Sequence, residues 1–213
     1  MLGRQRESVE HMQALPHRGV AAAVAAVRRA GVRPIVKLAF EFLVLTAARS
    51  GEVRGARWTE MDPAGRTWTV PAGRMKANRE HRVPLCGRAA ELLGAARGLG
   101  DGGPLVFPGA RGRPLKDEAL SRPLKDLAIA AVPHGFRSSF RDWASEETDH
   151  PREVVEAALA HAVRNPVEAA YARSDLFERR RRLMDEWCEC LAGEHRLGRH
   201  PVHRVRPRGA RPG

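Results

Sequence analysis

Apolar residues recur with helical spacing over most of the chain. The widest apolar face begins after Pro34 and predicts a helix that is buried on nearly all sides. That face is formed by Val36, Leu38, Ala39, Phe42, Leu43 and Leu45. Similar patterns predict helices at about 18–30, 87–98, 135–147 and 151–161. The helix predicted after Asp117 contains Pro123, which should kink or break it.

Two segments have the composition of strands instead. Residues 66–72 (RTWTVPA) and 81–85 (HRVPL) flank the basic connection RMKANREH. Pro84 restricts the second strand to an edge or its own end, since proline has no amide to donate. Together with the helices, this hairpin predicts a mainly α fold with a small antiparallel sheet, of the α+β class.

Capping patterns mark further helix starts. Ser50 can cap a short helix whose positive end suits Glu52. Asn165, with Pro166 at the first helical position, starts a short helix that contains Tyr171. Asp175 repeats the pattern and starts the last helix. Its apolar stripe is formed by Leu176, Leu183, Met184, Trp187 and Leu191, and should dock on its own domain or on a neighbouring subunit.

The length and the ends of the chain indicate one domain. A chain of 213 residues can bury one sizeable core, which we place at 15–192. Residues 1–14 are polar and are expected to be an arm or a remnant. Residues 193–213 consist mostly of Gly, Pro, His and Arg, and we expect a disordered basic tail.

The charge favours a polyanionic partner. Lys and Arg total 37 against 25 Asp and Glu, and only four of the 37 are lysine. Binding to nucleic acid would release counterions, although biased codon usage would also produce such a composition. Three cysteines suit a reducing cytoplasm, and the N-terminus lacks the apolar core of a signal peptide. Because the apolar run at 35–48 is interrupted by charges, we expect no membrane partner and a cytoplasmic location.

Four residues in the second half carry potential chemistry. His134 and Arg137 are three apart, so at a helix start they lie on one face and can address one anion. His161 ends an apolar turn, and Tyr171 is the only tyrosine. Taken singly, each has an ordinary explanation: a capping histidine, a surface arginine, a core histidine and a packed tyrosine. Their combination favours a common site.

These residues, with two further motifs, resemble the catalytic domain of the tyrosine recombinases, the phage-type integrases. TAARSGE (46–52) resembles that family's first-arginine motif, and HGFR (134–137) its H-x-x-R box. LAH (159–161) lies where the family has its second histidine, Tyr171 has the nucleophile's spacing, and RMK (74–76) lies in its lysine-bearing hairpin. The resemblance implies six catalytic residues: Arg49, Lys76, His134, Arg137, His161 and Tyr171.

The chemistry of these side chains agrees with the implied roles. Arg49 and Arg137 each offer a planar set of donors to phosphate oxygens, which lysine cannot supply. Tyr171 would be the covalent nucleophile, with His134 as its base and His161 as a hydrogen-bond donor to the phosphate. Lys76 would protonate the departing 5′-oxygen. The reaction needs no cofactor and no metal.

Three arginines beside Lys76 are expected to hold the hairpin against the DNA backbone, although a solvated hairpin would contain similar residues. They are Arg74, Arg79 and Arg82. A zinc site at Cys188, Cys190, His195 and His200 is rejected, because residues two apart on a helix point opposite ways.

The resemblance also implies partners. They are double-stranded DNA in the nucleoid and further copies of the chain, assembled on DNA as a tetrameric synapse for integration or excision of a mobile element. Complete family members carry an additional N-terminal DNA-binding domain, where we see only a short arm. The alternative is therefore a truncated remnant that binds DNA without recombining it. A type IB topoisomerase shares the chemistry, but the motifs resemble integrases more closely.

Overall fold

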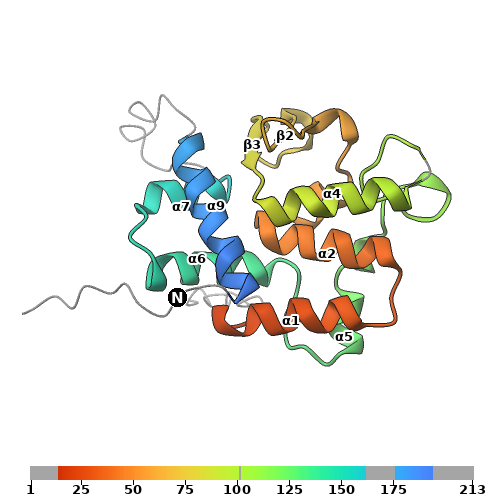
Figure 1. The fold of residues 1–213 in the computed structure, drawn as a ribbon, viewed down its shortest axis with the longest axis horizontal. Coiled ribbons are helices and arrows are strands. Elements are labelled where there is room, and N and C mark those ends of the chain that lie inside the picture. Colours follow the sequence, from red (N-terminus) through yellow and green to blue (C-terminus); the bar gives the residue numbers. More distant parts are fainter. Residues whose placement is uncertain (1–13, 101, 162–175, 194–213) are drawn as a thin grey trace, which may run out of the picture.

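The structure, a computed structural model, describes residues 14–100, 102–161 and 176–193. These residues form a mainly helical fold with a small antiparallel sheet, as predicted (Figure 1). α2 (Pro34–Thr46) lies at its centre, and ten of its residues are buried. Around it pack α1 (His17–Arg29), α4 (Gly87–Leu99) and the short α3 (Ser50–Arg54). The mostly apolar sequence of α2 is thus explained by neighbours on several sides.

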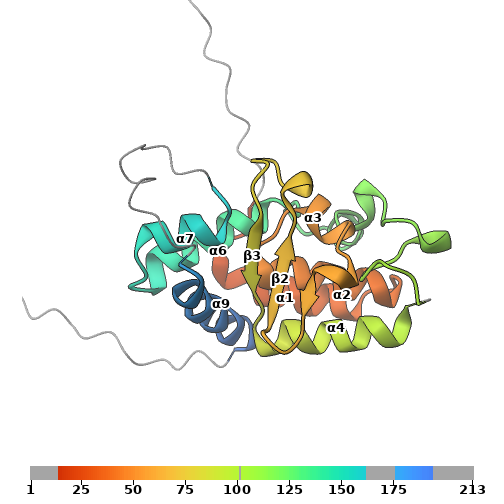
Figure 2. The same cartoon turned by 90° about the horizontal axis from the view of Figure 1, so that it is seen from above.

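The sheet has the order β1-β2-β3, from β1 (Met61–Asp62), β2 (Thr67–Val70) and β3 (His81–Pro84). β2 and β3 are the two predicted strands, and their pairing runs from Thr67 opposite Pro84 to Val70 opposite His81. Pro84 ends an edge strand, as predicted. β1 was not predicted, because two residues show no alternation. Seen from above, the sheet lies over the helices, and the connection from β2 to β3 projects from one of its ends (Figure 2).

The second half of the chain begins with broken helical turns. A 3₁₀ turn at Asp117–Ala119 precedes α5 (Arg122–Asp126), which carries Pro123 in its first turn. The helical turns are therefore interrupted between Ala119 and Arg122, just before the break predicted at Pro123. α6 (Gly135–Glu147) has the predicted bounds, and α7 (Arg152–Ala158) is shorter than the predicted 151–161.

The last helix, α9 (Phe177–Ala192), packs on its own domain, which is one of the two expected docking sites. It contacts α7, β3, α1 and α2. Trp187 is fully buried, its ring centroid lies 4.9 Å from that of Trp143, and its Nε1 donates to the Val44 carbonyl at 3.0 Å. The N-cap of α9 is Leu176 with φ 53°, whereas Asp175 lies outside the described residues.

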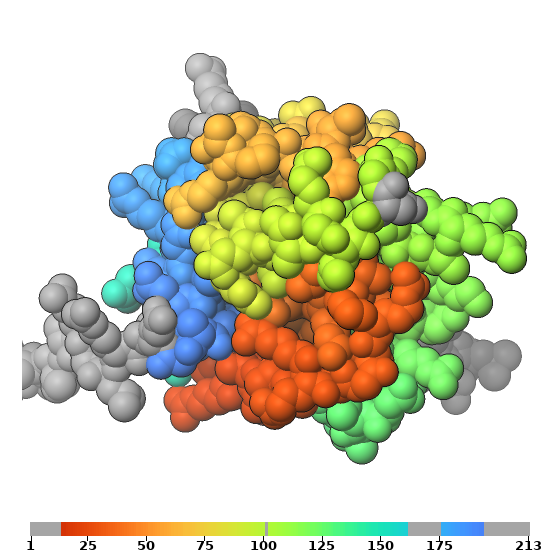
Figure 3. Space-filling view, turned by 45° about the vertical axis from the view of Figure 1, so that its right-hand side comes forward, coloured from red at the N-terminus to blue at the C-terminus, as the bar shows by residue number. Residues whose placement is uncertain are grey.

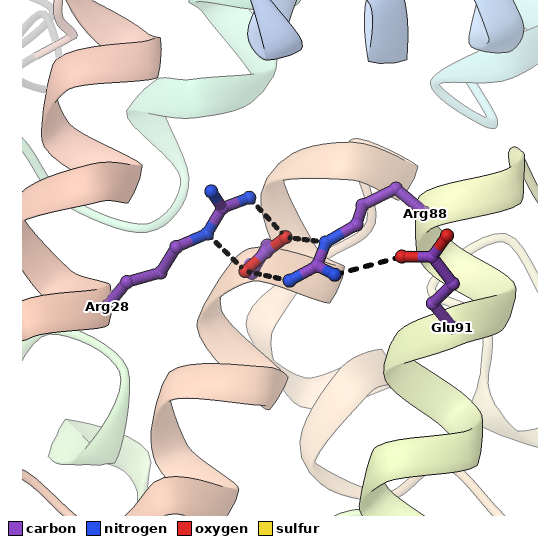
Figure 4. A network of polar contacts seen from close by, with 4 residues as sticks. Arg28, Arg88 and Glu91 are labelled. Carbon is purple, nitrogen blue, oxygen red and sulfur yellow. Dashed lines mark hydrogen bonds and ion pairs between the residues drawn. The ribbon is translucent and has the colours of Figure 1, made fainter.

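One polar network is enclosed between α1, α2 and α4. Glu41 of α2 is 2% exposed and accepts hydrogen bonds from Arg28 at 2.7 Å and from Arg88 at 2.7 Å (Figure 4). Arg88 also donates to Glu91 at 2.9 Å. The three helices form one continuous face of the molecule (Figure 3). Burying this carboxylate is tolerable because both of its oxygens are bonded to cations.

No helix within the described ranges combines the length and the apolar character needed to cross a bilayer.

Candidate active site

Arg49 is positioned by an abrupt end to α2. The helix stops at Ala47, whose φ of 47° is left-handed, and α3 begins three residues later with Arg49 as its N-cap. The prediction that Ser50 is the cap was wrong by one residue. Glu52 lies in the first turn of α3, as predicted. Its carboxylate accepts hydrogen bonds from the Arg49 amide at 2.9 Å and from the Arg49 guanidinium at 2.8 Å. The carboxylate thereby fixes both ends of the arginine.

Arg137 extends from the first turn of α6 into the interior and is 4% exposed. Its Nη1 donates to the carbonyl of Ala47, and its Nη2 donates to the carbonyl of Leu159 at 2.6 Å. It therefore connects the end of α2 with the end of α7. Burial and the nearby Arg49 lower the pKa of Arg137 to about 10. The residue stays charged at neutral pH, but no carboxylate within the described residues is hydrogen-bonded to it.

His161 follows a second left-handed alanine, Ala160, with φ 48°. Its Nδ1 lies 2.6 Å from a Glu156 carboxylate oxygen, and its Nε2 lies 3.4 Å from Nη2 of Arg137. Glu156 thus favours the tautomer with the proton on Nδ1 and turns the other nitrogen toward the arginine. The ends of α2 and α7 resemble each other in this respect. In each, a left-handed alanine turns the chain and a site residue follows.

His134 lies at the point where the other predicted residues converge. It is the exposed N-cap of α6, one turn before Arg137. Its pKa is lowered by partial burial and by the positive charges of its neighbours. The neighbours are Arg137, Arg49, His161 and Lys76. The structure thus brings together five of the six predicted catalytic residues, from the ends of three helices and one hairpin.

Lys76 is exposed in the connection between β2 and β3, and Arg79 is exposed in the same connection. Arg82, on β3, places its guanidinium 4.0 Å from the centroid of the Phe177 ring. Arg74 differs from both. Its guanidinium contacts the Glu60 carboxylate and donates to the Glu52 carbonyl. Arg74 therefore has donors bonded inside the protein, at the place where the connection leaves β2.

His81 was not predicted as a site residue, yet it lies in the same field of positive charge. Burial, together with the charges of Arg180, Arg137 and Arg49, lowers its pKa to about 4. The sequence shows His81 only as the first residue of a strand. The only sequence feature that could have indicated a place for His81 near the site was its closeness to Lys76 in the predicted hairpin.

Tyr171, the predicted nucleophile, lies outside the described residues. The described chain reaches His161 on one side of it and resumes at Leu176 on the other. His161 belongs to the site, and α9, which starts directly after Leu176, contacts β3.

This arrangement suits stabilisation of a dianionic phosphate in a transfer reaction. Two guanidinium groups supply positive charge and directional donors, while a histidine held neutral can accept a proton. On a mainly helical domain with a three-stranded antiparallel sheet, such a set is the arrangement of a tyrosine recombinase catalytic domain. Residues 14–176 match the model of the phage integrase family. The chain belongs to this family.

Proteins with similar sequences support the same family membership. Prophage integrase IntA of Escherichia coli (strain K12) is 36% identical over 168 residues, which cover 77% of this chain and 40% of that protein. The integrase of Enterobacteria phage P4 is 31% identical over 173 residues, covering 73% of this chain and 39% of the relative. The chain thus spans about 40% of the length of these relatives.

Solved structures share the fold. The integrase from mycobacterium phage Brujita superimposes with a TM-score of 0.61 at 19% identity, over 86% of this chain and 60% of that one. A lambda integrase (75–356) dimer bound to a COC′ core site gives 0.58 at 21% identity, over 81% of this chain and 62% of that one.

Proposed function

We propose that this chain is the catalytic part of a site-specific DNA recombinase. It cleaves and rejoins DNA strands through a 3′-phosphotyrosyl intermediate, in the integration or excision of a mobile element. The observation that carries the proposal is the convergence of Arg49, Arg137, His161 and Lys76 around His134. Family membership supports the same activity.

In the proposed reaction the Tyr171 oxygen attacks the scissile phosphorus, so a P–O(Tyr) bond forms as the P–O5′ bond breaks. Ionising a free tyrosine at pH 7 costs about 4 kcal/mol, because its pKa lies near 10. His134 accepts the tyrosine proton, since its lowered pKa keeps it neutral. Lys76 donates a proton to O5′. Water attack is not needed to reverse the step, because the phosphotyrosyl bond retains the energy for rejoining.

The two arginines stabilise the additional negative charge that develops on the non-bridging oxygens. Arg137 is already fixed by two carbonyls and Arg49 by Glu52, so neither loses much freedom when a phosphate binds. Each guanidinium nitrogen that donates to a carbonyl retains a second N–H, so both donors and charge remain for the substrate. His161, held through Nδ1 by Glu156, would donate from Nε2 to the phosphate in its imidazolium form, with the Glu156 carboxylate as the counter-charge.

Double-stranded DNA in the nucleoid is the proposed substrate, with Arg79 and Arg82 as contacts to its backbone. Arg74 has its guanidinium bonded to Glu60 and Glu52, so we propose a supporting rather than a direct role for it. Assembly of several copies on DNA is also proposed. It is supported by the fold shared with a lambda integrase dimer on a core site and with a lambda integrase tetramer on a Holliday junction.

Covalent trapping tests the proposal directly. The chain is incubated with supercoiled plasmid, quenched with SDS and examined for a protein–DNA adduct, with Tyr171→Phe as the control. Because Tyr171 is the only tyrosine, phosphotyrosine released by hydrolysis of the adduct can have one source. The expected result is an adduct in the wild type and none in the variant. A folded wild-type chain that shifts DNA mobility without any adduct would instead support a DNA-binding protein that does not recombine.

A further inference from the structure

Lys76 lies in a tight turn directly after two anchored residues. The 3₁₀ turn Ala72–Arg74 leads from β2 into it, and the next side chain, that of Met75, is buried in the core. The Met75 carbonyl accepts a hydrogen bond from the Asn78 amide at 2.9 Å, so the chain closes a turn around Lys76. Lys76 itself is exposed. Its distance from the other site residues therefore depends on what holds the chain just before it.

The first acceptor for the Arg74 side chain is a carboxylate that is itself fixed. The Glu60 side chain is 7% exposed, and it accepts hydrogen bonds from the Trp68 indole nitrogen at 3.0 Å and from the Arg57 amide at 3.2 Å. Trp68 is fully buried in β2. Nη1 of Arg74 donates to the same carboxylate at 2.5 Å. Because the other donors already orient this carboxylate, it holds the guanidinium in one position.

The second acceptor belongs to α3, the helix that Arg49 caps. Nη2 of Arg74 donates to the main-chain carbonyl of Glu52. The carboxylate of the same Glu52 holds the Arg49 guanidinium at 2.8 Å. One residue thus binds the first catalytic arginine through its side chain and the hairpin through its backbone.

Gly55, which ends α3, leaves the space that the Arg74 guanidinium occupies. A Cβ at this position would lie 3.0 Å from Nη2 of Arg74 and 3.4 Å from its Cζ. The φ of Gly55 is −102°, so the backbone conformation does not itself require glycine. A side chain here would therefore disturb the place of the guanidinium rather than the turn of the chain.

We propose that Arg74 is a positioning residue, which fixes Lys76 relative to Arg49. It does so by bonding the hairpin to Glu60 and to the backbone of α3. The proposal rests on the proposed function, in which Lys76 protonates the leaving oxygen. Arg74 acts through Lys76 rather than on the phosphate, because the Glu60 carboxylate already compensates its charge.

The test uses two duplexes with the sequence at which the wild-type chain forms its adduct on plasmid DNA. One has the natural 5′-oxygen at the scissile phosphate, and the other has a bridging 5′-sulfur. A thiolate departs without a proton, because thiol pKa values lie near 8.5. At saturating DNA, Lys76→Ala and Arg74→Ala should each cleave the oxygen duplex on the order of 10²-fold more slowly than the wild type, for a missing or misplaced acid. Both should cleave the sulfur duplex nearly as fast as the wild type.

A variant that keeps Arg74 separates positioning from stability, because Arg74→Ala also removes the cation beside a buried carboxylate. Gly55→Ala should displace the guanidinium and slow cleavage of the oxygen duplex by less than about tenfold, with recovery on sulfur. Combined with Arg74→Ala, it should cause no further loss, since no guanidinium is left to displace. A loss that persists in the double variant would mean that Gly55→Ala acts on α3 itself, which contradicts the proposal.

Arg54→Ala is the matched control. The Arg54 side chain is 20% exposed, against 22% for Arg74, and it also bonds a carbonyl, that of Leu115 at 2.8 Å, and a carboxylate, that of Asp117. Arg54 lies on α3 but connects this helix to the segment around Leu115 and not to the hairpin. The ratio of its rates on the oxygen and sulfur duplexes should remain that of the wild type.

Other outcomes would overturn the proposal in different ways. If sulfur restores Lys76→Ala but not Arg74→Ala, Arg74 does not act through Lys76, and the proposed function remains. If sulfur restores neither, the assignment of Lys76 as the acid fails together with the inference. Wild-type cleavage of the oxygen duplex by Arg74→Ala would show that the hairpin holds Lys76 without it. A wild-type chain that forms no adduct on plasmid DNA would remove the proposed function, and the inference with it.

Amide hydrogen exchange gives a second measurement that needs no cleavage. In Arg74→Ala, the Asn78 amide should exchange about tenfold faster, because the turn can open without breaking the bonds to Glu60 and to α3. Arg54→Ala should leave this rate unchanged. Unaltered exchange at Asn78 in Arg74→Ala would contradict the proposal even if cleavage is lost.

Discussion

Two groups of arginines in this protein show how the partner of an arginine determines what it can do. Arg88 donates to the carboxylates of Glu41 and Glu91, and these bonds raise its pKa. Arg137 donates to two neutral carbonyls, and burial beside Arg49 lowers its pKa to about 10. The first charge is compensated within the protein (Figure 4). The second is held in place without being neutralised.

The difference has a consequence for ligands. Arg88, which is bonded to two carboxylates, gains little from a further anion, because both pairs would have to be separated first. Arg137 is oriented by carbonyls and has no carboxylate hydrogen-bonded to it among the described residues, so an approaching phosphate need not displace an ion pair. The Glu41 network therefore supports the fold, and the Arg137 group is prepared for substrate.

The largest expected effect comes from replacing the uncompensated arginine. Arg137→Lys should lower the single-turnover rate of adduct formation by about 10²–10³-fold, since lysine cannot bond both carbonyls and still present donors to the phosphate. Arg88→Lys is the matched control and should leave the rate within a few-fold of the wild type. Equal losses in the two variants would mean that the contrast between the groups has no bearing on chemistry.

A smaller effect is expected from removing the compensating carboxylate. Burial raises the pKa of Glu41, but the hydrogen bonds from Arg28 and Arg88 outweigh it and hold the pKa below its usual value of 4.5. Glu41→Gln should therefore lower the free energy of unfolding by about 1–3 kcal/mol, measured with urea at pH 7. The loss stays moderate because both arginines are partly exposed and can turn to water.

The same variant carries a pH signature. A group with a depressed folded pKa contributes stability that is present above its unfolded pKa and is lost as the pH falls through the folded value. The difference between wild type and Glu41→Gln should thus be constant at neutral pH and shrink below pH 4.5. Cleavage per folded molecule should be unaffected, and a large loss of cleavage at full folding would contradict the structural role.

The smallest expected effect concerns the histidine beside the uncompensated group. His81 has a folded pKa of about 4 against an ordinary 6.5, so the unfolded chain binds more protons between these values. Stability from this residue is complete above pH 6.5 and declines as the pH falls toward 4. At pH 5.5 the loss should be roughly 1 kcal/mol.

His81→Gln, which does not titrate, should remove this part of the acid sensitivity. The measurement is urea unfolding of both proteins at pH 7.5 and 5.5. Parallel losses in the two proteins would show that burial and the charges of Arg180, Arg137 and Arg49 do not lower the pKa of His81 as described.

Features that depend on neighbouring residues in the sequence could be predicted, and features that depend on contacts between distant segments could not. α2, α6 and the hairpin depend on periodicity and local turn residues, so their places were predicted closely. The motif around Arg49 was also recognisable, but its capping geometry was misplaced by one residue because Arg49 and Glu52 form a local bond that Ser50 was expected to make.

Contacts between distant segments could not be predicted. Arg74 has the same sequence surroundings as Arg79, and only the folded chain shows that Glu60 and the Glu52 carbonyl bind it. Only the folded chain brings His81 close to Arg49, Arg137 and Arg180, which come from other elements. Likewise, a carbonyl carries no sequence signal, so neither Ala47 nor Leu159 could be predicted as a partner of Arg137.

The position of Arg137 between the ends of α2 and α7 also bears on how such an enzyme fails. A nuclease-like centre that survived partial damage to its protein would break chromosomes without resealing them. Here the arginine loses one of its two carbonyls as soon as either helix end frays. Under the proposed function, a chain weakened by heat, mutation or proteolysis would therefore stop cleaving DNA before it loses its shape. A partly damaged protein would then leave the host genome unbroken.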